Sequence, residues 1–484
     1  MDDSVATAED ETPTATEADR PVLSLWDATS LMIGIVVGTS LFVSPRMVFG
    51  HVSSPMTGIL TWLVGGILST IGALLFAELA VSVPRGGSYA YLTAAFGKSA
   101  GLIYGVALVS VMLTANIGAM AFAFARYART ILLHFGVTPE SAAGMGPWLA
   151  AAAVFILAVF NTGGFRIGRL TQNLLTAAKL LGLGLIVFAG LWVSLKKNDV
   201  DVHVANAGAV SVDYPLAMVI VLYAFGGWSD AATVAAEVRN RSRNIPLALV
   251  GGLAAVTAIY VAVNAAYVTG IGFSALQQSD LPAFDVVNAA GWGAAASQGV
   301  SLLVMISALG AVQGMLFSGS RAVAAIGSDH SSLRPLGVWN AKNHVPTRAI
   351  WLLAGIALVQ IGLVGTGPGR LLVDRVLGAI GVGAVEWSRY GDGFDVLVYG
   401  SAPTFWALML GVGAAFYVLR GAGRTPTEFR APGGPIVPLV YLATCGFMLY
   451  RATTFAGPLG VVGVVACLAG GLLAVVTKRM DARR

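Results

Sequence analysis

Two glycine-rich stretches, VVGTSLFVSP at residues 36–45 and YAFGGWSDAATVAAEV at residues 223–238, decide the fold of this sequence. Each interrupts an apolar run that would otherwise continue as one helix. The first glycine of one stretch lies 12 residues after Trp26, and the first glycine of the other lies 12 residues after Tyr214. Matching interruptions of this kind predict two helices that are broken at corresponding places. The alternative is that these glycines only let neighbouring helices pack closely.

The composition places most of the chain in lipid. Of its 484 residues, 56% are apolar and only 11% are charged, whereas soluble domains carry about 25% charged residues. The mean hydropathy is +0.78. A water-soluble enzyme is therefore excluded. Lys and Arg exceed Asp and Glu by 29 to 24, but these charges form short scattered clusters, so no nucleic-acid partner is expected.

Apolar runs of about 20 residues predict twelve transmembrane helices. Their approximate ranges are 25–45, 57–83, 101–128, 147–163, 171–195, 214–236, 246–270, 297–326, 347–365, 397–420, 436–452 and 458–477. Breaks in the first and sixth spans are what a five-plus-five inverted repeat would contain. The expected units are 23–195 for the first repeat, 214–420 for the second, and 436–477 for two additional C-terminal helices.

The distribution of Lys and Arg predicts the orientation in a plasma or inner membrane. With the N terminus inside, nineteen of these cations fall in cytoplasmic segments and nine fall outside, as the positive-inside rule requires. Both termini are then cytoplasmic. Residues 1–22 contain seven acidic side chains and are expected to form a disordered tail, and 478–484 form a second tail. The segment from Thr366 to Phe394 is a long external excursion and a candidate lid.

Broken helices at mid-membrane create a ligand site. Free backbone N–H and C=O groups are costly there unless they line a hydrated cavity or hold a polar ligand. N–H groups suit a carboxylate, and carbonyls suit an ammonium group. A solute that carries both groups on one carbon fits such a pair, so an α-amino acid is the first expectation. Because the sequence has no phosphate-binding loop and no nucleophile motif, transport would be secondary and the protein would not be an enzyme.

Several motifs resemble the amino acid/polyamine/organocation superfamily, most closely its L-type amino acid transporter branch. The matching segments, between about Leu23 and Leu449, are GTSLFVSP (38–45), AELAVSVPRGGSYAYL (77–92), LTAAKLLGL (175–183), FGGW (225–228), EVRNRSRNIP (237–246), MLFSGSR (315–321), VPTRA (345–349) and FRAPGGPIVPL (429–439). The resemblance implies an all-α integral membrane protein with the LeuT-like inverted-repeat fold. It also implies alternating access around a central amino acid site, with proton coupling or exchange.

The resemblance also implies which residues bind the substrate. Its carboxylate would lie at Gly38, Thr39 and Ser40, its amine at the carbonyls of Val36, Tyr223 and Gly226, and Phe225 and Gly227 would complete the FGGW turn. Two positions depart from the family pattern. Ser40 stands where a third glycine is usual, and the occluding aromatic is Tyr223 instead of phenylalanine or a smaller residue. Both changes bear on side-chain specificity and leave the binding mode intact.

Lys179 is the expected coupling residue. If the fifth span begins at Thr171, its ammonium lies about 12 Å into the hydrocarbon, beyond easy reach of the interface. A charge at that depth costs several kcal/mol unless it is paired or neutralised. In the family, a lysine here stands where sodium-coupled relatives hold an ion, so it would contact the backbone at Gly34–Gly38 and Ser307. The alternative is a lysine that merely reaches a polar loop.

Four charged residues form a candidate cytoplasmic gate. Glu78 and Glu237, at the inner ends of spans two and six, would pair with Arg85 or Arg239. Solvated helix ends are the alternative. Asp230 would either orient the broken segment or cap it locally. If Asp230 or Glu78 pointed into the pocket, the protein would be a polyamine or organic amine carrier, and a non-transporting amino acid sensor is a further alternative.

Polar residues elsewhere indicate a neutral pocket without cofactors. Few charges lie at mid-depth, which favours a neutral L-amino acid; Thr114 and Asn116 in span three would either face this pocket or join helices. No metal is expected, because the five histidines lie in or beside loops without ligand spacing. The outer loop from Glu140 to Pro147 contains no cysteine, so a disulfide-linked ancillary subunit, known for some animal relatives, is not expected. The expected partners are the substrate and the lipid bilayer.

Overall fold

The computed structural model describes residues 23–83, 87–163, 169–196, 212–231, 238–340, 342–423 and 428–481. Within these ranges the protein is almost entirely helical. Extended backbone pairs there only at two isolated bridges, Leu23 with Val238 and Asn340 with Val345. The prediction of an all-α protein is confirmed. The acidic tail at 1–22 and the last three residues of the C-terminal tail lie outside the described residues.

Eight helical segments of the described chain are long and apolar enough to cross a membrane. They are α3 (Pro55–Ser82), the run of α5 (Lys98–Ala107), η3 (Leu108–Leu113) and α6 (Thr114–His134), most of α9 (Arg169–Lys196), α12 (Arg241–Ile271), α15 (Ala294–Asp329), α16 (Thr347–Gly365), α18 (Gly393–Gly421), and the stretch holding α19 (Ile436–Ala456) and α20 (Val461–Asp481). Three shorter apolar helices are α1 (Leu25–Val36), α8 (Gly146–Thr162) and α10 (Tyr214–Ala224). The protein is a multi-pass membrane protein.

Shorter elements join the long helices. They are α2 (Pro45–Phe49), α4 (Gly87–Phe96), α7 (Pro139–Gly144), α11 (Trp228–Ala231), α13 (Phe273–Gln278), α14 (Pro282–Ala289), α17 (Gly367–Ala379), η2 (Thr39–Phe42), η5 (Ser331–Gly337), η6 (Trp387–Arg389) and η7 (Gly457–Gly460). The candidate lid at 366–394 therefore contains a helix, α17. Asp374 on α17 accepts hydrogen bonds from the Val385 N–H and the Trp387 Nε1–H, both at 2.9 Å, which holds the segment in one compact arrangement.

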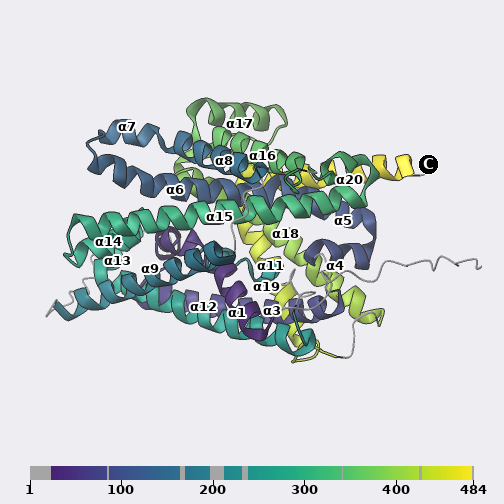
Figure 1. Ribbon diagram of the computed structural model, residues 1–484, viewed down its shortest axis with the longest axis horizontal. Coiled ribbons are helices and arrows are strands. Elements are labelled where there is room, and N and C mark those ends of the chain that lie inside the picture. The colour runs from purple at the N-terminus through teal and green to yellow at the C-terminus, as the bar shows by residue number, and fades with distance from the viewer. Residues whose placement is uncertain are drawn as a thin grey trace, which may run out of the picture.

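The long helices lie side by side along the long axis of the molecule (Figure 1). α6 packs along α15, and α3 packs along α12. The α3–α12 crossing is close because it uses a glycine: a Cβ atom at Gly66 would lie 2.2 Å from Thr257 Oγ1. Small residues at such crossings are how membrane helices approach one another. Close packing therefore explains this glycine.

The outer faces of several helices carry large apolar side chains that nothing covers. Leu181 and Leu195 on α9 are 75% and 81% exposed, and Leu468 and Leu472 on α20 are each 69% exposed. In water this would be an aggregation hazard, but hydrocarbon chains solvate such side chains well. These faces are consistent with lipid contact, and the polar groups that matter for function lie between the helices.

Candidate functional site

The first broken helix ends at the predicted interruption. α1 stops at Val36, Gly38 is extended with φ −91° and ψ −172°, and the short 3₁₀ turn η2 begins at Thr39. The Val36 carbonyl no longer has a partner one helical turn ahead. It accepts hydrogen bonds from the Gly38 N–H at 2.7 Å and from the Tyr260 hydroxyl at 2.9 Å. A non-helical segment therefore lies in the interior, with its exposed backbone acceptor satisfied from α12.

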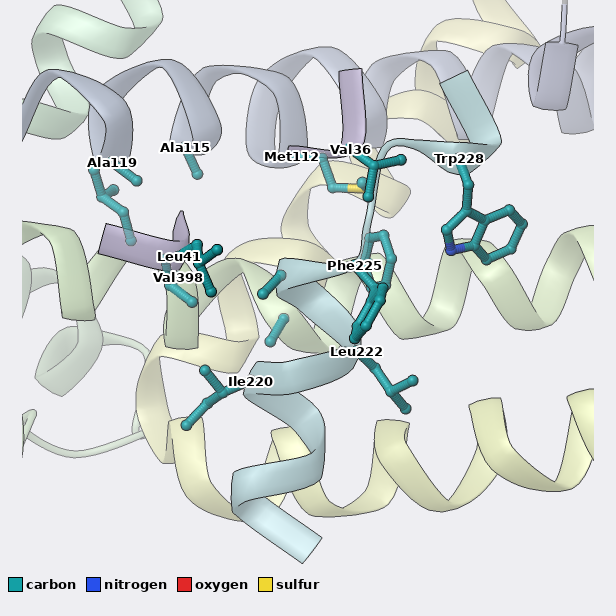
Figure 2. Close-up of a cluster of buried hydrophobic side chains, with 14 of the residues drawn as sticks. Val36, Leu41, Met112, Ala115, Ala119, Ile220, Leu222, Phe225, Trp228 and Val398 are labelled. Carbon is teal, nitrogen blue, oxygen red and sulfur yellow. The ribbon is translucent and has the colours of Figure 1, made fainter. Parts of the chain in front are cut away.

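The second broken helix is interrupted by the FGGW turn. α10 ends at Ala224, and the Gly226 N–H donates to the Tyr223 carbonyl at 2.9 Å. Gly227 has φ +102°, and a Cβ atom there would lie 3.2 Å from Ile35 Cγ2 and 3.4 Å from the Ile35 carbonyl oxygen. Only glycine adopts this conformation without strain. The second break thus packs directly against the last turn of α1, as seen beside Val36 in Figure 2.

Tyr260 on α12 links the two breaks. Its hydroxyl lies 2.9 Å from the Val36 carbonyl oxygen and 3.2 Å from the Ala224 carbonyl oxygen, so one proton is shared between the ends of two half-helices. The ring is buried and packs against Trp62 and Phe225, with centroid distances of 5.4 and 4.8 Å. The Phe225 side chain therefore serves packing. Tyr260 is not recognisable as a site residue from the sequence, because a tyrosine in an apolar run carries no local sign of such distant partners.

The predicted carboxylate-binding residues lie around η2. Thr39 is buried, and its Oγ1 lies 3.5 Å from Ser307 Oγ on α15. The structure thus brings together two residues that the sequence assigned to substrate binding and to coupling. Ser40 is half-buried, and its carbonyl accepts from the Ser44 hydroxyl at 2.8 Å. Gly38 is also half-buried, with no atom closer than 3.8 Å to an added Cβ.

Lys179 is buried in α9, with 9% of the residue exposed. α9 packs against both α12 and α15, the helices that carry Tyr260 and Ser307. Among the ion pairs of the described chain, none involves Lys179. An ammonium group in this position is expensive to keep charged. In this respect Lys179 differs from Arg46, Arg126, Arg420 and Arg451, each of which lies within 4 Å of a carboxylate.

Two of the four predicted gate residues, Glu78 and Arg239, lie in the described part of the chain. Glu78 is fully buried; its Oε2 accepts the Ala431 N–H at 2.8 Å, and its Oε1 lies 3.6 Å from Arg420 Nε. This carboxylate ties α3 to the end of α18 and to the segment before α19. The backbone N–H of Arg239 donates to the Leu23 carbonyl at 2.9 Å, which joins the start of α1 to the start of α12. The other two predicted gate residues, Arg85 and Glu237, and the Asp230 side chain lie outside the described residues.

An arginine–aspartate network, which the sequence did not predict, lies at the α2 end of the bundle. Its members are Arg46, Arg126, Asp280, Asp392 and Asp395. Arg46 contacts Asp395 at 2.6 Å and Asp280 at 2.7 Å. Arg126 donates two hydrogen bonds to Asp392, at 2.6 and 3.0 Å, and lies 3.4 Å from Asp395. Although burial favours protonation of Asp392, the Arg126 guanidinium holds the pKa of this carboxyl below its usual range.

A cavity of about 740 Å³ adjoins this network. Arg46 and Asp395 line it together with a second ion pair, Asp213 with Arg451, and the aromatic residue Tyr399. Along the chain, η2 and α2 connect the first break to Arg46, which lines the cavity. The segment that follows the broken first helix therefore contributes to both the network and the cavity.

The Tyr223 hydroxyl has partners on two other helices. It donates to Asn116 Oδ1 on α6 and lies 3.4 Å from Ser401 Oγ on α18. The ring packs edge-on against Phe405, with a centroid distance of 5.7 Å. The sequence identified Tyr223 as the occluding aromatic and Asn116 as a candidate pocket residue. It gave no indication that the two side chains meet, because they are 107 residues apart in the chain.

Residues 23–471 match a family model described as amino acid permease. The chain belongs to the amino acid permease family. This permease is 30% identical over 346 residues to the b(0,+)-type amino acid transporter 1 of Homo sapiens, covering 70% of the permease and 69% of that protein. It is 28% identical over 357 residues to the serine/threonine exchanger SteT of Bacillus subtilis (strain 168), covering 72% and 78%.

A third relative of the permease is the large neutral amino acids transporter small subunit 2 of Mus musculus, 30% identical over 313 residues that cover 62% of the permease and 56% of that protein. These relatives confirm the resemblance to the L-type amino acid transporter branch of the amino acid/polyamine/organocation superfamily. All three are amino acid transporters or exchangers by name, and none is an enzyme.

Proposed function

We propose that this permease carries a neutral L-amino acid across a plasma or inner membrane by alternating access. The observation that carries the proposal is the contact between two interrupted helices deep in the bundle, with Gly227 against Ile35. The substrate ammonium would bind the carbonyls of Val36, Tyr223 and Gly226. Its carboxylate would bind the backbone N–H groups and hydroxyls of the turn at 38–40. Opposite groups of one small zwitterion then bridge the two breaks.

We further propose that the helices form twelve crossings. In this grouping α1, η2 and α2 make the first span, α10 and α11 make the sixth, and α19 and α20 are the two appended spans. The corresponding positions of the two breaks support inverted repeats at 23–195 and 214–420, with 436–477 added. Both termini lie in the cytoplasm in this arrangement. The arginine–aspartate network is then the outer gate.

The inner gate in this proposal comprises Glu78 and Arg239, with Arg85 and Glu237 as further members. Glu78 ties α3 to the end of α18 through Arg420 and to the segment before α19 through the Ala431 N–H. Breaking this contact would release α3 from the end of α18 and from the segment before α19. Lys179, buried without an acidic partner in the described chain, is the proposed coupling charge, and the contact between Thr39 and Ser307 links its neighbourhood to the first break. Its role is either proton coupling or a fixed charge in an exchanger.

The polyamine alternative needs an acidic side chain in the pocket. Glu78 was one of its two candidates, and its two oxygens contact the Ala431 N–H and Arg420 at the helix ends. A neutral site therefore has better support. The three relatives, all amino acid transporters or exchangers by name, favour a carrier over a sensor. We propose that the permease works without a disulfide-linked subunit, since both of its cysteines lie in apolar helices.

Counterflow in proteoliposomes tests the proposal. Purified permease is reconstituted into vesicles loaded with unlabelled neutral amino acids, and uptake of a labelled one is measured. Saturable, stereoselective uptake is expected. Binding without flux would indicate a sensor, and uptake of diamines alone would indicate an amine carrier.

One variant tests whether this uptake depends on the second break. Gly226→Val places its Cβ 2.8 Å from the Tyr223 carbonyl oxygen and should abolish uptake without preventing insertion. The matched control is Gly251→Val on α12, where an added Cβ meets no atom within 4 Å. Normal uptake by Gly226→Val would remove the second break from the site.

A further inference from the structure

A chain of polar side chains crosses three helices beside the second break. Tyr223 on α10 donates its hydroxyl proton to Asn116 on α6, and its oxygen lies 3.4 Å from the Ser401 hydroxyl on α18. The Ser401 proton is already donated within α18, to the Leu397 carbonyl at 2.7 Å. The only proton of Tyr223 thus goes to Asn116. Lone pairs on the tyrosine oxygen remain for a further donor.

The Asn116 amide has hydrogen-bonding capacity left over. Its oxygen accepts from Tyr223, and among the described residues no group accepts a hydrogen bond from its amide nitrogen. The nitrogen is not one of the fully buried side-chain atoms without a partner in the described structure, so it is at least partly accessible. If the oxygen and nitrogen of the amide exchanged places, an unpaired acceptor would face the same space instead. Either way, Asn116 offers one polar atom to a ligand.

The backbone of the third span is irregular immediately before Asn116. η3, from Leu108 to Leu113, is a π-helical turn, and the regular helix α6 resumes at Thr114. The Ser110 carbonyl within this turn accepts a hydrogen bond from Gln360 Nε2 on α16 at 3.1 Å. Such turns are rare and occur frequently at functional sites, where the additional residue re-aims the side chains that follow. Here the first polar side chains that follow are Thr114 and Asn116.

The helices that carry this polar chain also carry buried apolar side chains. Figure 2 shows Ala115 and Ala119 on α6 with Leu41, Ile220 and Val398, which belong to η2, α10 and α18, and all five are buried. Asn116 and Tyr223 are half-buried, whereas their neighbours Ala115 and Ala224 are buried. The two polar side chains are therefore partly accessible, beside buried apolar neighbours. A hydrogen bond made in apolar surroundings is stronger than one made in bulk water.

We propose that Asn116 and Tyr223, supported by Ser401, form a subsite that selects substrates with a hydroxyl-bearing side chain. A hydroxyl both accepts and donates, so it can accept from the Asn116 amide and donate to the Tyr223 oxygen. A methyl group in its place leaves both partners unsatisfied. A site built to bond a hydroxyl rejects the apolar analogue far more strongly than an apolar pocket rejects a hydroxyl. This inference rests on the proposed function and names the substrate class of that site.

The isosteric pair threonine and valine tests the subsite. Competition by each against labelled alanine counterflow is measured in proteoliposomes, and threonine is expected to compete at least about tenfold better. In Asn116→Leu the two amino acids should compete almost equally well, so the ratio of their inhibitory strengths should approach one. The reason is that the KM for threonine rises while the KM for valine falls or stays the same. Tyr223→Phe, which keeps the aromatic ring, should reduce the preference for threonine over valine less than Asn116→Leu does. Thr130→Val, at the far end of α6, is the matched control and should leave the ratio unchanged.

The outcomes separate this inference from the proposed function. Equal competition by threonine and valine in the unaltered permease would overturn the subsite and leave amino acid transport intact. A threonine preference that survives in Asn116→Leu would also overturn it. If no amino acid competed, the proposed function itself would fail. Should Asn116→Leu not fold, Asn116→Ala and the difference in thermal stabilisation by threonine and by valine decide the same question.

Discussion

The two broken helices use glycine for different physical reasons. At the second break, Gly227 has a positive φ, and its α-carbon packs so closely on Ile35 that a side chain would contact the neighbouring backbone. At the first break, Gly38 has an ordinary extended backbone, and an added Cβ would meet no atom closer than 3.8 Å. The packing and backbone conformation of the protein therefore require glycine at position 227 but not at position 38. Gly227 serves the fold, whereas Gly38 leaves room for the backbone of the first break to approach a ligand.

The largest effect is expected from Gly227→Ala. Alanine at φ +102° is strained and must also displace Ile35, so the variant should lose about 2 kcal/mol of stability together with its transport. The melting temperature of the purified protein in detergent checks the first part, and counterflow checks the second. Gly251→Ala on α12, where a Cβ meets open space, is the matched control. A fully stable Gly227→Ala would erase the contrast between the two breaks.

Gly38→Ala should have the opposite profile. The variant is expected to melt within about a degree of the unaltered permease, because its backbone conformation suits any residue. Its kcat/KM for counterflow should fall about tenfold, since the added methyl group occupies the space proposed for the substrate. Unchanged transport would show that the substrate does not approach this glycine. A large drop in melting temperature would show that Gly38 too is structural.

Lys179→Ala sharpens the comparison, because this lysine is proposed to act on the first break. It should resemble Gly38→Ala, with a loss of flux of about tenfold or a changed pH dependence, and with little loss of stability. Lys179 has no acidic partner among the described residues, so removing its buried ammonium group relieves a desolvation cost and the melting temperature should stay or rise. A variant whose rate and pH profile match those of the unaltered permease would exclude the coupling role.

The smallest effect is expected from Tyr260→Phe, which acts on both breaks at once. The Val36 and Ala224 carbonyls lose their shared donor, at a cost of about 1 kcal/mol, while the ring contacts with Trp62 and Phe225 remain. Thermal unfolding with and without substrate measures this. Substrate should restore part of the lost stability, because its ammonium group would donate to one of these two carbonyls, that of Val36. Equal losses in the presence and absence of substrate would contradict that role.

Much of the architecture could be predicted from the sequence because the relevant signals are local. Apolar runs predicted most of the long helices, and glycine spacing predicted the interruptions near Gly38 and Gly226. Boundaries were less accurate. The third span was expected at 101–128, but its helical run covers 98–134, because lysine at its start and His134 at its end stay helical beyond the apolar core. The excursion at 366–394 also contains a helix, α17, that was not predicted from the sequence.

The contacts that organise the candidate site could not be predicted in the same way. Tyr260 meets Val36 across 224 residues of sequence, and Arg46 meets Asp395 across 349. Nothing in the neighbourhood of either arginine in the network distinguishes it from a cation at a helix end. The partner of each side chain is set by which helices become neighbours. That information is absent from periodicity and composition, which report only on the segment itself.

The sequence by itself determined that this protein spans a membrane, that two of its helices are interrupted at matching positions, and that its motifs resemble those of amino acid permeases. These properties depend on hydrophobicity, backbone preference and short motifs, which act over one helix at a time. Only the tertiary structure decided that one glycine is packed and the other is open, that Tyr260 joins the breaks, and that Tyr223 meets Asn116. Hydrogen bonds act over about 3 Å, so they exist only once distant helices have packed together.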